Sequence, residues 1–187
     1  MHMVRIIPEH DYSQREITVI NILKDVNINL NMFINVGFHD WDDARRHWWT
    51  KFCESNNIDW KIIEIFEPNI VDAIDKGCPE DKIFELDIND VDNIPDGDCL
   101  FFWHGPEHVE KETFLATLKR LENKYPLLIF GMPIGDQPQD DAYGNPWEIH
   151  VSAWETLEWE QLGYTVIEVH DGHEYSHITV FKINNIT

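Results

Sequence analysis

Glu67 ends an apolar run and is followed at once by a proline, a pattern that could bring one carboxylate to a ligand. Residues 60–66 predict a buried strand, and Pro68 suits the first turn of a following helix. In an open α/β sheet, ligands bind at the carboxyl edge of the strands, where an acidic side chain can accept hydrogen bonds from both hydroxyls of a ribose. Glu67 therefore predicts a site for an adenosine-like molecule.

Three histidines, His104, His108 and His150, are candidate general bases, because an unperturbed imidazole titrates near neutral pH. Glu107 directly precedes His108 and is suited to orient a histidine or to bind a substrate. Such histidines could take a proton from an alcohol, a phenol or an acid during group transfer.

The same residue types are ligands for divalent metals. His104, Glu107 and His108 form one such group, and His150 could join either this group or the next. A second group consists of His39, Asp40, Asp42, Asp43 and His47. However, the chain has no short signature such as His-Glu-x-x-His, and a run of acids at a helix start is explained by the helix dipole. We therefore expect no bound metal and keep a metal-dependent hydrolase as an alternative.

Residues 133–153 show little periodicity and are rich in Gly, Pro, Asp and Gln, which predicts a long loop on the substrate side of the molecule. Long loops in compact domains are often functional, especially at the carboxyl edge of a sheet. The candidate substrate contacts are Tyr143, Asn145 and Glu148 in this loop, together with Glu107.

Short apolar runs alternate with amphipathic stretches along the first two thirds of the chain. This alternation is typical of a parallel sheet covered by helices on both faces. The predicted strands are 32–37, 60–66, 82–86, 98–103 and 126–132, and the predicted helices between them are 42–55, 69–76 and 107–125.

The last third of the chain has a different pattern. Residues 154–162 predict a helix, and two β-branched runs, 164–170 and 175–183, flank Asp171-Gly172, which is a hairpin signal. Residues 13–27 predict an N-terminal helix that Ser13 can cap. The expected fold is α/β and Rossmann-like, with seven mostly parallel strands, helices on both faces and a C-terminal antiparallel hairpin.

Composition agrees with a single domain over residues 1–187, since 43% of the residues are hydrophobic and no linker divides them. The formal charge of −21 would repel phosphate backbones, so we expect no nucleic-acid partner. No apolar segment approaches the roughly 20 residues that cross a bilayer, so we expect no membrane partner and a cytoplasmic protein. Three cysteines without metal-ligand spacing predict reduced thiols.

Taken together, these features resemble the class I, Rossmann-like S-adenosylmethionine-dependent methyltransferases over nearly the whole chain. In that family the first strand leads into a glycine-rich turn, and residues 34–41 hold that place here, with Gly37 matching the central glycine. Asn35 stands where an acidic residue is usual, while His39 and Trp41 replace further glycines. The motif is therefore a degenerate form of the family's first motif.

The later motifs match the family more closely. Glu67 falls where the ribose-binding carboxylate ends the second strand, and Asp87 falls where a polar residue often reads the adenine amine. The tripeptide Glu107-His108-Val109 resembles one that many small-molecule methyltransferases carry after the fourth strand. The cofactor contacts that the resemblance implies are Asn35, Gly37, His39, Trp41, Glu67, Asp87 and Ile88.

The resemblance implies S-adenosylmethionine as cofactor and methyl transfer to a small molecule as activity. A non-catalytic binding protein with this fold is a further alternative, although acidic residues at two strand ends favour a working site. A nicotinamide oxidoreductase is disfavoured because its Gly-x-Gly-x-x-Gly turn is absent. The sequence leaves the methyl acceptor and the oligomeric state open.

Overall fold

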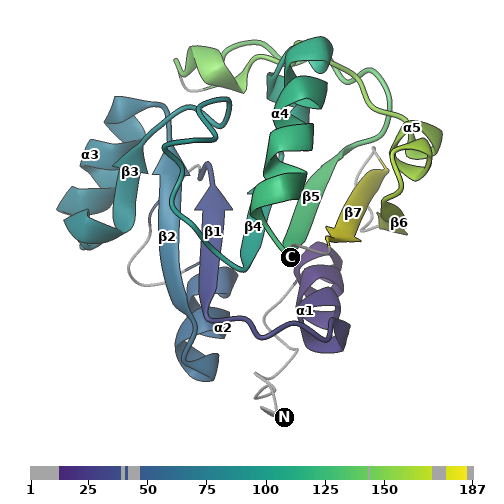
Figure 1. The fold of residues 1–187 in the computed structure, drawn as a ribbon. Helices are drawn as coiled ribbons and strands as arrows, with labels where there is room; N and C mark the ends of the chain where they lie inside the picture. The colour runs from purple at the N-terminus through teal and green to yellow at the C-terminus, as the bar shows by residue number, and fades with distance from the viewer. Residues whose placement is uncertain (1–12, 39–40, 42–46, 143, 170–175, 185–187) are drawn as a thin grey trace.

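The computed structural model describes residues 13–38, 41, 47–142, 144–169 and 176–184. Within them, seven strands form one sheet in the order β3-β2-β1-β4-β5-β7-β6 (Figure 1). The first five strands pair in parallel, and β7 is antiparallel to both β5 and β6. The strands are β1 (Met32–Val36), β2 (Asp59–Glu64), β3 (Ile83–Glu85), β4 (Cys99–Trp103), β5 (Leu127–Pro133), β6 (Thr165–Val169) and β7 (His177–Ile183).

Helices connect the strands and cover both faces of the sheet. In α1, Ser13 and Glu16 form a capping box, so the predicted cap is confirmed. The α-helices are α1 (Gln14–Asp25), α2 (Trp48–Asn56), α3 (Glu67–Asp75), α4 (Lys111–Lys124) and α5 (Thr156–Gln161), and the short 3-10 helices are η2 (Glu80–Lys82), η3 (Pro106–His108) and η4 (Pro146–Glu148).

Two apolar cores lie on opposite faces of the sheet. One contains side chains from α4 and α5, and the other contains side chains from α1, α2 and α3. Adjacent residues of β1 illustrate the division, because Phe33 belongs to one core and Ile34 to the other. Burial on both faces explains why the parallel strands read as continuous apolar runs.

The expected fold class is confirmed, whereas several element boundaries differ from their predictions. Strand β2 ends at Glu64, and Glu67 is already the first residue of α3. The predicted helix 107–125 is divided into η3 and α4. Residues 42–46, predicted as helical, and the Asp171-Gly172 turn lie outside the described residues, although β6 and β7 have the antiparallel pairing that the turn predicted. No helix in the described part of the chain is long and apolar enough to cross a membrane.

All three cysteines are buried in the structure, which predicts unreactive thiols. Burial raises the pKa of each thiol, that of Cys78 to about 11, with Asp81 adding to the effect. Because the thiolate is the reactive form, we expect Cys53, Cys78 and Cys99 to resist Ellman's reagent at pH 8 in the folded protein. All three should react promptly in guanidinium. Stoichiometric labelling of the native protein within minutes would contradict this burial.

Candidate functional site

A cavity of about 780 Å³ lies at the carboxyl ends of β1, β2 and β4. Its size is within the range of about 300–1,000 Å³ that is typical of ligand pockets. The green segment that contains η4 crosses the molecule above this edge of the sheet (Figure 1). Ligands of open α/β sheets bind at this edge, so the topology itself marks the cavity as a candidate site.

The end of β1 and the turn that follows it form one wall of the cavity and contain two of the predicted cofactor residues. Asn35 and Gly37 both line the cavity. The Asn35 side chain donates a 2.6 Å hydrogen bond to the carbonyl of Gly37, and Gly37 has a φ of 71°, a left-handed conformation that favours glycine. The Asn35 hydrogen bond thus stabilises the turn, and Gly37 permits the backbone conformation that the turn requires.

Of the other two predicted residues of this segment, only Trp41 is among the residues that the structure describes, and it does not line the cavity. Trp41 is absent from the residues that line it, and its ring packs against Phe38, His47 and Trp60 in the core. His39 lies outside the described residues. Aromatic packing therefore accounts for Trp41, whose large apolar ring is better buried than exposed at a polar site.

The structure places Glu64, not Glu67, at the end of β2 beside the cavity. Glu67 is exposed at the start of α3 and does not line the cavity, whereas Glu64 is 5% exposed and lines it. Oε1 of Glu64 accepts 2.8 Å hydrogen bonds from the backbone N–H groups of Ile65 and Phe66, and Oε2 accepts one of 3.2 Å from Phe38. This carboxylate therefore holds the segments that follow β1 and β2 together.

Burial raises the pKa of the Glu64 carboxyl, and its backbone hydrogen bonds oppose that rise because they favour the ionised form. Asn69 contributes a further hydrogen bond in the same direction, and its side chain also donates to the carbonyl of Phe38 at 3.1 Å. Several N–H groups thus converge on one carboxylate at the wall of the cavity.

The segment after β3 supplies a second acidic residue, as the sequence predicted. Asp87 and Ile88 both line the cavity. Oδ1 of Asp87 accepts hydrogen bonds from the backbone and side chain of Asn89, at 2.8 and 2.9 Å, and Ile88 is 6% exposed. A polar group and an apolar surface therefore lie side by side on this wall.

The end of β4 forms the opposite wall. Trp103 lines the cavity, and its ring occupies space on Gly131 of β5, where a Cβ would lie 2.2 Å from the ring. His104 follows with a φ of 48° and also lines the cavity. Nη1 of Arg15 lies 3.3 Å from Nε2 of His104, and because a guanidinium can only donate, Nε2 is the acceptor. Nδ1 of His104 therefore carries the hydrogen, which it donates to Oε1 of Glu107 at 3.2 Å.

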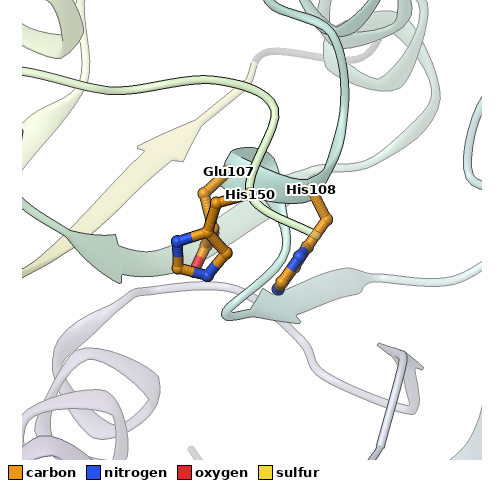
Figure 2. Close-up of side chains that lie close together, drawn as sticks. All are labelled: Glu107, His108 and His150. Carbon is orange, nitrogen blue, oxygen red and sulfur yellow. The ribbon is translucent and has the colours of Figure 1, made fainter. Parts of the chain in front are cut away.

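Glu107, His108 and His150 come together at the margin of the cavity. One potential ligand atom from each lies within 4.8 Å of the other two. Figure 2 shows Glu107 and His108 extending from the same helical turn, with His150 reaching them from the loop. Of the three, only His108 lines the cavity, and Glu107 is buried, with 2% of its surface exposed.

The described residues of the loop over 133–153 are held by hydrogen bonds within the loop. The Asn145 side chain accepts from the backbone N–H of Trp147 at 3.0 Å and so caps the start of η4, and Gln139 donates to the carbonyl of Glu148 at 2.7 Å. Both Asn145 and Glu148 line the cavity, as a substrate contact must. Tyr143 lies outside the described residues.

Sequence reasoning did not select Glu64, Trp103 or the aromatic rings of Phe38 and Phe102 among the residues that line the cavity. Glu64 carried a usable signal, because a charged residue inside an apolar run must have partners if it is buried. The aromatic residues gave no such signal, because aromatic side chains are equally typical of a protein core.

Comparisons with models of protein families and with curated protein sequences gave no match. Among solved structures, the methyltransferase domain of bacterial CtHen1 is similar, with 19% identity, a TM-score of 0.60 and coverage of 91% of this chain and 98% of that one. A S-adenosylmethionine-dependent methyltransferase from Clostridium acetobutylicum ATCC 824 gives 10% identity, a TM-score of 0.62 and coverage of 94% of each chain.

The N-terminal domain of EvdMO1, solved with S-adenosylhomocysteine bound, gives 11% identity, a TM-score of 0.62 and coverage of 95% of this chain and 82% of that one. At such identities the similarity concerns the fold. The chain therefore has the Rossmann-like fold of S-adenosylmethionine-dependent methyltransferases, which confirms that part of the resemblance drawn from the sequence.

Proposed function

We propose that the chain is a S-adenosylmethionine-dependent methyltransferase that acts on a small molecule. The observation that carries this proposal is the cavity at the carboxyl edge of the sheet, where the Gly37 turn, Glu64 and Asp87 meet. Each comes from a different strand end, and together they offer a backbone turn and two carboxylates to one ligand. The same fold occurs in a protein solved with S-adenosylhomocysteine.

The residues around the cavity are suited to the parts of this cofactor. Glu64 would face the ribose, and Asp87 and Ile88 would receive the adenine through its amine and its ring. A Cβ built on Gly37 has no neighbour nearer than 4.0 Å, so the turn leaves room for a ligand. The cofactor supplies a methyl group on a cationic sulfonium, which the acidic and aromatic walls of the cavity would stabilise.

Methyl transfer from a sulfonium is an in-line displacement, so much of the rate comes from holding the acceptor close to the methyl group. The ordered loop would do this with Asn145 and Glu148 and would shield the reaction from water. The imidazoles of His108 and His150 lie at the same margin. Their lone pairs could take a proton from the acceptor or hold an ion that makes the proton easier to lose.

A small, neutral or cationic acceptor fits this site better than nucleic acid. Residues 145–149 of the loop line part of the cavity, and the formal charge of −21 opposes the approach of a polyanion.

Isothermal titration calorimetry with S-adenosylhomocysteine tests the proposal. We expect one ligand per chain with a dissociation constant in the micromolar range, and no heat with NAD⁺ as the control nucleotide. S-adenosylmethionine should compete for the same site. Absence of binding by both sulfur nucleosides at millimolar concentration would reject the function.

A further inference from the structure

We infer that Glu107, His108 and His150 bind a divalent transition-metal ion at the margin of the cavity. The sequence favoured a protein without metal, because these residues form no recognised short signature. In the fold, however, η3 and the loop after β5 place one ligand atom of each residue within 4.8 Å of the others (Figure 2). Two imidazoles and one carboxylate form a donor set that suits zinc, manganese or iron.

The carboxylate of Glu107 gives the first independent support. Its side chain is buried, and Oε2 has no hydrogen-bond partner among the described residues, whereas Oε1 accepts from His104. A buried carboxylate oxygen without a partner is costly, and native proteins rarely leave one so. A cation held between this oxygen and the two imidazoles would remove that cost.

The hydrogen bonds of the two histidines give the second support. Nδ1 of His108 lies 3.3 Å from the carbonyl oxygen of Ile149, and Nδ1 of His150 contacts the carbonyl oxygen of Gln137. A carbonyl only accepts, so each Nδ1 carries a hydrogen, and in the neutral ring each Nε2 then keeps the lone pair that a metal ion needs. Metal-bound histidines are held in this way, with the second ring nitrogen donating to a backbone carbonyl.

The protein backbone fixes the two halves of the proposed site against each other. The carbonyl of Glu107 accepts hydrogen bonds from the N–H groups of Val151, at 2.9 Å, and Ser152, at 3.1 Å. The hydroxyl of Ser152 also donates to the carbonyl of Pro106 at 2.9 Å. The site is therefore largely formed, and metal–ligand bonds of about 2.0–2.2 Å would need the three side chains to close by roughly 1 Å.

Three protein ligands leave coordination positions open, and His108 borders the cavity, so an open position would face the substrate. Glu148 lies on that side, with Oε2 3.9 Å from Nε2 of His108.

If the proposed methyl transfer holds, an acceptor hydroxyl would coordinate the ion and lose its proton to solvent more readily. Its oxygen would then bond to the methyl carbon as the carbon–sulfur bond breaks, releasing neutral S-adenosylhomocysteine. This favours a hydroxyl-bearing acceptor.

Calorimetric titration of the chelator-stripped full chain with Zn²⁺, in about 150 mM salt to screen diffuse cation binding, tests the site. We expect one equivalent to bind with micromolar or tighter affinity. Glu107→Gln, His108→Ala and His150→Ala should each weaken binding at least tenfold. Glu112→Gln, which removes an exposed carboxylate from α4, is the matched control and should stay within twofold of the wild type.

Thermal unfolding separates loss of the site from loss of the fold. Glu107→Gln removes a buried charge, so the metal-free variant should unfold at or above the wild-type temperature, while only the wild type should be stabilised by added Zn²⁺. Equal Zn²⁺ affinity in the wild type and in Glu107→Gln would overturn the inference. Because the titration contains no nucleoside, its outcome is independent of S-adenosylhomocysteine binding, and each proposal can fail alone.

Discussion

Glu64→Ala will weaken S-adenosylhomocysteine binding at least tenfold and lower the free energy of unfolding by about 2–4 kcal/mol. The substitution removes the acceptor for the backbone N–H groups of Phe38, Ile65 and Phe66. Hydrogen bonds to a charged group contribute about 1.5–3 kcal/mol each, and relief of the burial that raises the pKa of Glu64 offsets part of their sum. The segments after β1 and β2 would separate, and the proposed ribose subsite would be lost.

Glu67→Ala is the matched control, because it removes the same side chain from an exposed position three residues along the chain. We expect a change of less than about 0.5 kcal/mol in stability and no measurable change in affinity. Calorimetry and urea denaturation measure the two quantities. The reverse result, in which Glu67→Ala abolishes binding and Glu64→Ala has no effect, would show that Glu67 is the ligand-binding carboxylate, as the sequence pattern predicted.

Trp159→Ala will lower the free energy of unfolding by about 3–5 kcal/mol, which is the usual effect of emptying a buried aromatic site. The Trp159 side chain is 0% exposed. Its ring lies 5.0 Å from those of Trp154 and Tyr164 and 5.5 Å from that of Phe130, measured between centroids. The substitution therefore leaves a cavity between α5 and the sheet.

Leu157→Ala tests whether this loss comes from packing or from the helix itself. Leu157 lies in the same helix but is 60% exposed, so its truncation should change stability by less than about 0.5 kcal/mol. Differential scanning calorimetry measures both variants, and the Trp159 variant should melt about 6–20 °C below the wild type. A Trp159 variant as stable as the Leu157 variant would contradict the packing described for this core.

The fold was predictable from sequence because its signals are local and repeat along the chain. Alternating apolar runs and amphipathic stretches indicated a parallel sheet with helices on both faces, and the structure confirms this. The Asp171-Gly172 signal likewise predicted two antiparallel strands, which are observed as β6 and β7. Boundaries were less predictable, since Pro106 begins a separate short turn before α4.

The end of β2 shows why the site was harder to predict than the fold. Ile65 and Phe66 extend the apolar run, so the sequence pattern continues to Glu67. The parallel pairing with β1 nevertheless ends at Ile63, and that with β3 ends at Glu64. Tertiary pairing, which a single sequence does not reveal, decides where the strand stops and which carboxylate reaches the cavity.

Local sequence patterns also could not predict that Glu107, His108 and His150 lie close together. Glu107 and His108 are adjacent, but His150 is about forty residues away and reaches them only because the loop folds back onto η3. The sequence identified all three as chemically capable residues. Their distances and the unpartnered Glu107 oxygen required the structure.

A crystal structure with S-adenosylhomocysteine is the most direct test of the proposed cofactor site. We predict the adenine beside Asp87 and Ile88, the ribose beside Glu64, and the sulfur directed toward the loop that carries Asn145 and Glu148. A ligand bound anywhere else, or a cavity without ligand in crystals soaked at saturating concentration, would contradict the proposed function.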